Sequence, residues 1–119
     1  MANEISCSCS LSASKNGASV SGSGTKNLDL SGSEMISNVQ TFGTSEAAVV
    51  LGGCDQAKKL LVKNLDAAAT FTLSLDNPAT QILSVIQPGD AILLSGVSTT
   101  LYGKSSSGTI NVNVVCVED

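Results

Sequence analysis

The chain contains no histidine, no arginine and no tryptophan among its 119 residues. Histidine is the side chain most often used for proton transfer near neutral pH, and arginine is the most common ligand of phosphate and carboxylate groups. Without them, acid–base chemistry and anion recognition would rest on carboxylates and lysines alone. The composition therefore favours a protein that maintains a shape and makes contacts over one that catalyses a reaction.

Aromatic residues are almost as scarce, since Phe42, Phe71 and Tyr102 are the whole complement. Apolar residues nevertheless make up 42% of the chain, so the core must be built mainly from Val, Leu, Ile and Ala. Burying these side chains gains about 0.8 kcal/mol per CH₂ group, less per residue than burying a large aromatic ring. We expect contacts between copies of the chain to offset this shortfall, and therefore a homo-oligomer.

Charged residues account for only 13% of the chain, about half the usual share, and the net charge is -4. Nucleic-acid binding requires clustered Lys or Arg, but the only close lysines are Lys58, Lys59 and Lys63. We therefore expect no nucleic-acid partner. A surface with so few charges must be covered by Ser, Thr, Asn and Gly, or by other protein subunits.

Long hydrophobic runs are also missing. No segment approaches the roughly 20 apolar residues that a membrane-spanning helix needs. The N-terminal residues Met-Ala-Asn-Glu-Ile have neither a basic head nor an apolar stretch, which argues against a secretory signal. The expectation is a chain made in the cytosol that does not enter a membrane.

Four cysteines are present, at positions 7, 9, 54 and 116. Zinc sites usually combine two close pairs of ligands, whereas only Cys7 and Cys9 are close in sequence here and no His can complete a set. Cys7, Cys9 and Cys116 fall on the apolar phase of their segments, so we interpret them as small buried hydrophobes. A Cys9–Cys116 disulfide stays open as an alternative if the terminal strands are neighbours.

Apolar and small polar residues alternate along most of the sequence, as in Phe-Thr-Leu-Ser-Leu at 71–75 and Ile-Asn-Val-Asn-Val at 110–114. Successive side chains of a strand point to opposite faces, so this alternation predicts half-buried strands. Strands recur every 8–12 residues with turn signals between them, and no long segment has helical periodicity. The sequence predicts an all-β protein, an antiparallel β-sandwich of the jelly-roll or immunoglobulin-like type.

The first 25 residues differ from the rest. Strict alternation over 5–14 leads into Asn16-Gly17, the strongest short signal for a hairpin turn, and a return strand rich in Ser and Gly follows over 18–25. A lone hairpin is marginally stable in water, so it should require a partner. We predict one domain overall, with an N-terminal hairpin arm at 1–25 and a sandwich at 26–119.

Further strands are expected in the sandwich, and the segment 46–51 could be a helical turn or a strand, with strand favoured. The predicted strand positions are 28–30, 35–42, 60–63, 70–75, 80–86, 91–94, 99–102 and 109–117.

No arrangement of residues points to catalysis or to a ligand. The many serines lack a histidine base, an S-x-x-K motif and a G-x-S-x-G elbow, and Gly52-Gly53 is too short for a phosphate loop. The turn aspartates are expected to bind backbone N–H groups, with a calcium site as the weaker alternative. They are Asp55, Asp66, Asp76 and Asp90. We predict no catalytic, cofactor-binding or metal-binding residues, no cofactor, and no enzymatic activity.

The second half carries a family resemblance. Its quoted segments are Leu-Leu-Val-Lys-Asn-Leu-Asp-Ala at 60–67, Phe-Thr-Leu-Ser-Leu-Asp at 71–76, Ile-Gln-Pro-Gly-Asp-Ala-Ile-Leu-Leu at 86–94 and Leu-Tyr-Gly-Lys at 101–104. Residues 45–119 resemble small β-sandwich virion proteins of tailed bacteriophages, and the Ser-rich opening does so more weakly. The shared motifs are structural turns, so no functional residue is carried over.

The resemblance implies a capsid cement or decoration protein that bridges the major capsid protein or other virion subunits. It implies a homo-oligomer, with a trimer favoured, in a virion assembled in the host cytoplasm. A phage tail, neck or fibre accessory protein is the first alternative. A carbohydrate- or ligand-binding sandwich, which would need exposed aromatic side chains, is the second.

Overall fold

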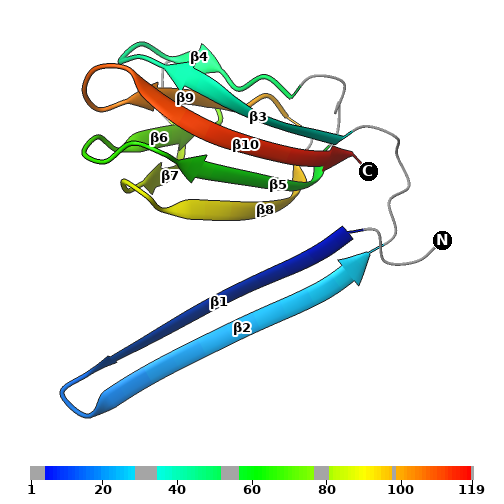
Figure 1. The fold of residues 1–119 in the computed structure, drawn as a ribbon, viewed down its shortest axis with the longest axis vertical. Coiled ribbons are helices and arrows are strands. Elements are labelled where there is room, and N and C mark those ends of the chain that lie inside the picture. Colours follow the sequence, from blue (N-terminus) through cyan, green and yellow to red (C-terminus); the bar gives the residue numbers. More distant parts are fainter. Residues whose placement is uncertain (1–4, 29–34, 52–56, 77–80, 98, 119) are drawn as a thin grey trace. The chain divides into compact units, whose positions relative to one another are not determined.

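The computed structural model describes residues 5–28, 35–51, 57–76, 81–97 and 99–118. All regular secondary structure in these residues is strand, and every pair of neighbouring strands is antiparallel. The predicted all-β, antiparallel class is confirmed. The chain divides into two compact units, Met1–Ser31 and Gly32–Asp119 (Figure 1).

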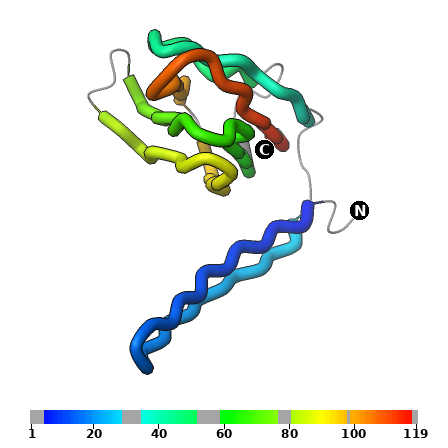
Figure 2. The backbone as a smooth tube through the Cα atoms, turned by 60° about the vertical axis from the view of Figure 1, so that its left-hand side comes forward, coloured from blue at the N-terminus to red at the C-terminus, as the bar shows by residue number. Residues whose placement is uncertain are grey.

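The first unit is a two-stranded hairpin of β1 (Ile5–Lys15) and β2 (Ala18–Leu28). Lys15 lies opposite Ala18, so Asn16 and Gly17 alone form the turn, and both have positive φ, 53° and 82°. This is the two-residue turn that Asn-Gly predicts. Lys26–Leu28 remain paired with β1, so the hairpin extends beyond the predicted residue 25 (Figure 2).

The second unit contains two four-stranded sheets (Figure 1). The first sheet has the order β3-β10-β5-β8 and consists of β3 (Met35–Phe42), β10 (Ile110–Glu118), β5 (Ala57–Asn64) and β8 (Ala91–Val97). The second has the order β4-β9-β6-β7 and consists of β4 (Ala47–Ala48), β9 (Tyr102–Ser105), β6 (Phe71–Ser74) and β7 (Ile82–Ile86).

The two sheets share one hydrophobic core. Along β10 the buried residues alternate with more exposed ones, as the sequence pattern predicts; they are Ile110, Val112, Val114 and Cys116. The second sheet contributes Phe71, Leu73 and Ile86, and the rings of Phe42 and Phe71 lie 4.8 Å apart between centroids. No member of this core cluster, as far as the described residues go, comes from the hairpin.

Two predicted strands differ in position. The segment expected at 99–102 begins at Tyr102 instead, because Leu101 is buried and its main-chain oxygen accepts a hydrogen bond from Val49 N–H at 2.8 Å. The ambiguous segment 46–51 contains only the short strand β4, and Val49 turns into the core. Several predicted features lie outside the described residues. They are the strand at 29–30, Gly52-Gly53, Cys54 and Asp55.

Asn64 links three turns at one end of the second unit. Its side chain is fully buried, and its Nδ2 donates to the main-chain oxygens of Ala69 and Ile86 at 2.9 and 3.1 Å. Its Oδ1 accepts from Asp66 N–H at 2.9 Å, and Gly89 N–H donates to the main-chain oxygen of Asn64 at 3.0 Å. The motifs at 63–66 and 87–90 are thus turns that hold the fold.

Candidate interaction surfaces

The hairpin has two chemically different faces, because its strands are in continuous register from Ile5–Leu28 to Lys15–Ala18. One face carries only Ser, Thr and Asn side chains. Its opposed pairs are Ser6–Asn27, Ser8–Thr25, Ser10–Ser23, Ser12–Ser21 and Ser14–Ser19. Such a row of hydroxyl and amide groups suits wet, hydrogen-bonded contacts.

The opposite face is apolar, buried at Ile5 and open further along the strands, and we call it the apolar hairpin face. It comprises Ile5, Cys7, Cys9, Leu11, Ala13, Ala18, Val20 and Leu28, with Gly22, Gly24, Lys15 and Lys26 among them. Leu11 is 75% exposed and Val20 is 66% exposed. These are high values for large apolar side chains on a strand whose other face is polar, so the face lacks the covering that a half-buried strand normally has.

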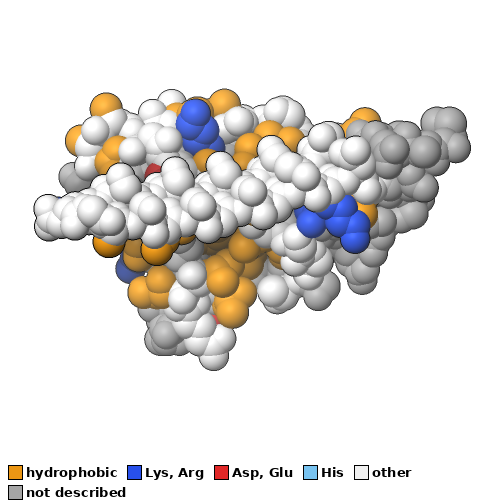
Figure 3. Space-filling model, turned by 90° about the horizontal axis from the view of Figure 1, so that it is seen from below, with side chains coloured by type: hydrophobic (Ala, Val, Ile, Leu, Met, Phe, Trp, Pro, Cys, Tyr) orange, Lys and Arg blue, Asp and Glu red, His pale blue; other side chains and the backbone are white. Residues whose placement is uncertain are grey.

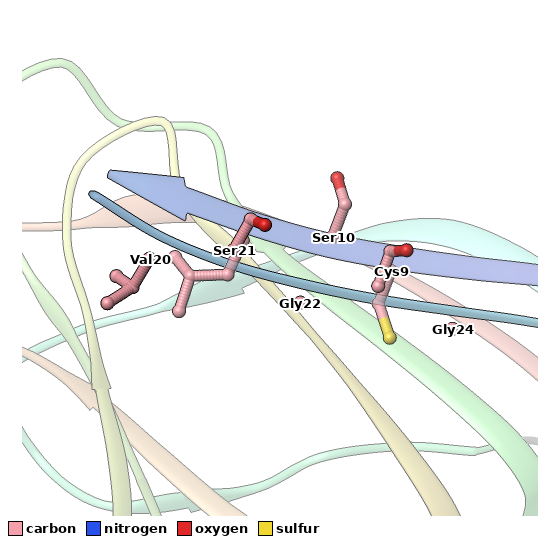
Figure 4. A pocket seen from close by; sticks show the side chains of 8 residues that line it. Cys9, Ser10, Val20, Ser21, Gly22 and Gly24 are labelled. Carbon is pink, nitrogen blue, oxygen red and sulfur yellow. The ribbon is translucent and has the colours of Figure 1, made fainter. Parts of the chain in front are cut away.

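Two glycines make this face uneven. Gly22 lies opposite Leu11 and Gly24 lies opposite Cys9, and a Cβ atom at either glycine would meet nothing within 4 Å. A shallow hollow results, lined by Cys9, Leu11, Val20 and their neighbours (Figure 4). In Figure 4, Cys9 and Ser10 project to opposite sides of the ribbon. A two-stranded ribbon cannot enclose a small ligand, so the hollow is better suited to receiving side chains of another protein.

Charged groups are thinly distributed over the described surface. Figure 3 shows a face on which polar and apolar side chains predominate and lysines form isolated groups. The described hairpin residues contain Lys15 and Lys26 but no Asp or Glu. Contacts with other proteins would therefore depend on shape, apolar area and hydrogen bonds more than on charge.

The three described cysteines differ in burial. Cys116 is buried in the core, Cys7 is half-buried and Cys9 is exposed. The expectation that all three would be buried is therefore wrong for Cys9, because the apolar hairpin face has no covering layer. Among the described strands, β10 pairs with β3 and β5, and β1 pairs with β2, so the strands of Cys9 and Cys116 are not paired in one sheet.

One carboxylate is enclosed in the second unit. The Glu46 side chain is only 8% exposed, its Oε2 accepts from Ser74 Oγ at 3.3 Å, and its Oε1 lies 3.9 Å from Lys104 Nζ. Oε1 has no hydrogen-bond partner. Ser74 is itself fully buried, so its hydroxyl is not presented to any substrate. The arrangement of Ser74 and Glu46 is therefore not that of an accessible nucleophile beside its base.

The described turn aspartates bind backbone groups of their own turns. Asp66 Oδ2 accepts from Ala68 N–H at 2.9 Å and from Ala69 N–H at 2.7 Å. These bonds to Ala69 and Ala68 lower the pKa of Asp66 below its ordinary value, because they stabilise the carboxylate. Asp76 Oδ1 accepts from Gln81 N–H and Asp90 Oδ1 from Ala91 N–H. Among the described residues no group of three or more potential metal ligands comes together.

The aromatic side chains do not form a platform for a sugar. Phe42 and Phe71 are 2% and 0% exposed in the core, which leaves Tyr102 as the single partly exposed aromatic ring. Sugar-binding and ligand-binding clefts are lined by several exposed aromatic side chains.

In the part of the chain that the structure describes, no helix is long and apolar enough to cross a membrane. Comparison with protein-family models, with curated proteins and with solved structures finds no match to this chain.

Proposed function

We propose that this chain is a non-enzymatic structural protein of a tailed-bacteriophage virion, a capsid cement or decoration protein. In this role its two packed sheets form a β-sandwich of the jelly-roll or immunoglobulin-like type, and the hairpin serves as an N-terminal arm. The resemblance of residues 45–119 to phage virion proteins supplies the class. The observation that carries the proposed mechanism is the apolar hairpin face, with Leu11 75% exposed and Val20 66% exposed.

The arm would bind a neighbouring subunit through this face. Fully burying a Leu or Val side chain contributes about 1.5–3 kcal/mol, so Leu11 and Val20 together could stabilise a contact appreciably. The row of hydroxyl groups on the other face would remain in water or join a second, wetter contact. The partner is the major capsid protein or another virion subunit, and the chain itself forms a homo-oligomer, with three copies as the favoured number.

A cement protein works mechanically. It covers joints between capsid subunits and adds interface area that opposes expansion of the head. Each contact can be modest, because many copies bound to one particle act together and avidity multiplies their effect. A contact of the same chemistry would serve a tail, neck or fibre component equally, and that remains the alternative location.

The test of this proposal is particle binding by matched variants of the full chain. Leu11→Ser and Val20→Ser together convert the apolar hairpin face into a polar one, while Ser8→Ala and Thr25→Ala together alter the opposite face away from the hollow. We expect the first pair to abolish binding to heads that lack the protein and the second pair to retain it. Removal of residues 1–31, which contribute nothing to the described core cluster, should give a folded chain that does not bind.

Full binding by the Leu11→Ser/Val20→Ser variant, or by the chain without residues 1–31, would contradict the role assigned to the arm. Turnover of a substrate by the purified chain would contradict the non-enzymatic class.

A further inference from the structure

Strand β7 is an edge strand whose sequence carries none of the usual protective residues, although it contains a β-bulge at Leu83. It is the last strand of its sheet and, among the described strands, it pairs with β6 alone. Natural proteins protect such edges with charged residues, proline or covering loops, because unpaired backbone groups bind other strands. The sequence of β7, Ile-Leu-Ser-Val-Ile, contains no charged residue and no proline.

The other three sheet edges of the second unit are better protected. Strand β4 is only two residues long. At β3, the side chain of Gln40 forms two hydrogen bonds with the backbone of Val50. Nε2 donates to Val50 O at 2.6 Å and Oε1 accepts from Val50 N–H at 3.0 Å. Strand β8 is distorted near its end, where Gly96 has φ of 64°. Within the second unit, β7 is therefore the described edge strand that has only its bulge as protection.

The side chains of β7 also lack neighbours. Ile82 is 55% exposed, Leu83 is 42% exposed and Val85 is 47% exposed. Leu83 is the extra residue at a register shift, so no residue of β6 lies opposite it. An edge strand with three exposed large apolar side chains provides both free backbone groups and apolar area for a partner strand.

The sequence around β7 reads the same in both directions in chemical type. Residues 81–87 are Gln-Ile-Leu-Ser-Val-Ile-Gln, with Ser84 at the centre. If two such strands lie antiparallel about a twofold axis at Ser84, each pair matches like with like. The pairs next to the axis are Ser84–Ser84 and Leu83–Val85, and a cross-strand apolar pair of this kind stabilises a sheet. The bulge at Leu83 ends the regular pairing beyond them.

The backbone direction of Val85 agrees with this register. Ser105 N–H donates to Gly43 O at 2.7 Å, so the backbone N–H and C=O of Ser105 point away from β6. Phe71 lies opposite Ser105 on β6, and its backbone N–H and C=O therefore point towards β7. Ile86, opposite Phe71, then faces β6, and by alternation Val85 presents its N–H and C=O to the open edge. Val85 is the residue that would lie opposite Leu83 of the second strand.

We propose that β7 pairs antiparallel with β7 of a second copy of this chain, about a twofold axis at Ser84, which joins two four-stranded sheets into one continuous sheet. A second copy is the partner for which every opposed pair matches in size and polarity and none brings like charges together. The contact uses no hairpin residue and goes beyond the proposed role of the arm, so either can fail while the other holds.

This contact is small. A pairing of about three residues from each chain falls well below the roughly 1,200 Å² typical of stable complexes, so it should be weak and reversible in solution. In an assembly of many copies it would add to the arm contacts through avidity.

The test uses the full chain and charges placed on both sides of the twofold axis. In Leu83→Lys/Val85→Lys, lysines at 83 and 85 face lysines of the second copy. In Leu83→Lys/Val85→Glu, each lysine faces a glutamate. Sedimentation velocity over a concentration series should show the weight-average mass of the wild type rising with concentration. The mass of the first variant should rise clearly less, whereas the second variant should follow the wild type.

Val39→Lys is the matched control, because Val39 is an exposed apolar residue on the edge strand β3, and it should leave the mass unchanged. Equal masses for the two double variants, or a wild-type mass that does not rise with concentration, would overturn the proposal. Far-UV circular dichroism establishes that each variant is folded.

A second measurement does not depend on charge. Ser84 would lie opposite itself in a pair without direct hydrogen bonds, where Cα atoms are about 4.5 Å apart and a disulfide can form. In a background where Cys7, Cys9 and Cys54 are replaced by Ser, Ser84→Cys should give a covalent dimer on mild oxidation. Ser95→Cys on β8 should not. A failure of Ser84→Cys to cross-link above the level of Ser95→Cys would also overturn the proposal.

Discussion

Asn64 Nδ2 donates to the main-chain oxygen of Ile86 at 3.1 Å, and this bond connects the end of β5 in one sheet to the end of β7 in the other. Both residues are buried. The same Asn64 side chain bonds Ala69 and Asp66, so one amide satisfies backbone groups from three segments of the chain.

Replacement of Asn64 by Ala should therefore be strongly destabilising. It would leave two buried carbonyl groups and one N–H group without their partner, and we expect a loss of about 3 kcal/mol in the free energy of unfolding. Denaturation by urea measures this loss. Asn38→Ala is the matched control at an exposed site on β3, and it should change stability by less than about 0.5 kcal/mol. Equal effects of the two substitutions would refute the linking role of Asn64.

Gly103 is constrained by the ring of Phe71. A Cβ atom at position 103 would overlap Cζ and Cε1 of that ring, which is fully buried and cannot move aside easily. Gly103→Ala should cost about 1–3 kcal/mol through overpacking and lower the melting temperature by roughly 10 °C. Gly43→Ala, where a Cβ would meet nothing within 4 Å, is the control. If Gly103→Ala has the melting temperature of the wild type, the core beside Phe71 can accommodate a Cβ atom and this explanation is wrong.

Asp66 should make stability depend on acid pH. Its pKa is lowered in the folded chain by hydrogen bonds from Ala69 and Ala68, so its contribution is fully present above the ordinary aspartate pKa of about 3.9. This contribution is lost as the pH falls through the lower folded value. Asp66→Asn should therefore flatten the loss of stability below about pH 4, as measured by thermal melting at a series of pH values. Parallel curves for wild type and variant would contradict this assignment.

The cysteines report whether the apolar hairpin face becomes covered. Cys9 is exposed on that face and Cys116 is buried in the core, so in the free chain an alkylating reagent should modify Cys9 at least about tenfold faster. In the assembled particle the rate at Cys9 should approach that of Cys116. Residue-resolved mass spectrometry measures both rates in one sample. An unchanged rate at Cys9 after assembly would mean that another surface makes the contact.

Much of the fold follows from local sequence signals. The alternation at 110–114 and the Asn16-Gly17 turn predict β10 and the hairpin directly, because period and turn chemistry are local properties. The start of β9 was placed too early, since Leu101 fits the apolar pattern of a strand but is held by Val49 from a distant segment. Long-range contacts of this kind leave no local mark.

The candidate surfaces can likewise be predicted from the sequence only in part. The two faces of the hairpin can be read from its sequence once the register is known, whereas the exposure of Cys9 could not, because it depends on whether anything covers the apolar face. Asn64 has the appearance of an ordinary turn residue, and its burial becomes evident only when three turns converge on it. The symmetry of residues 81–87 is visible in the sequence, but it acquires meaning because β7 lies at an edge.

The most direct test of the proposal that this chain is a virion protein that binds other subunits is negative-stain electron microscopy of the purified protein, alone and mixed with phage heads assembled without it. The account predicts regular oligomers in the first sample and shells bearing ordered protrusions in the second. Isolated monomers in the first sample together with bare heads in the second would contradict it.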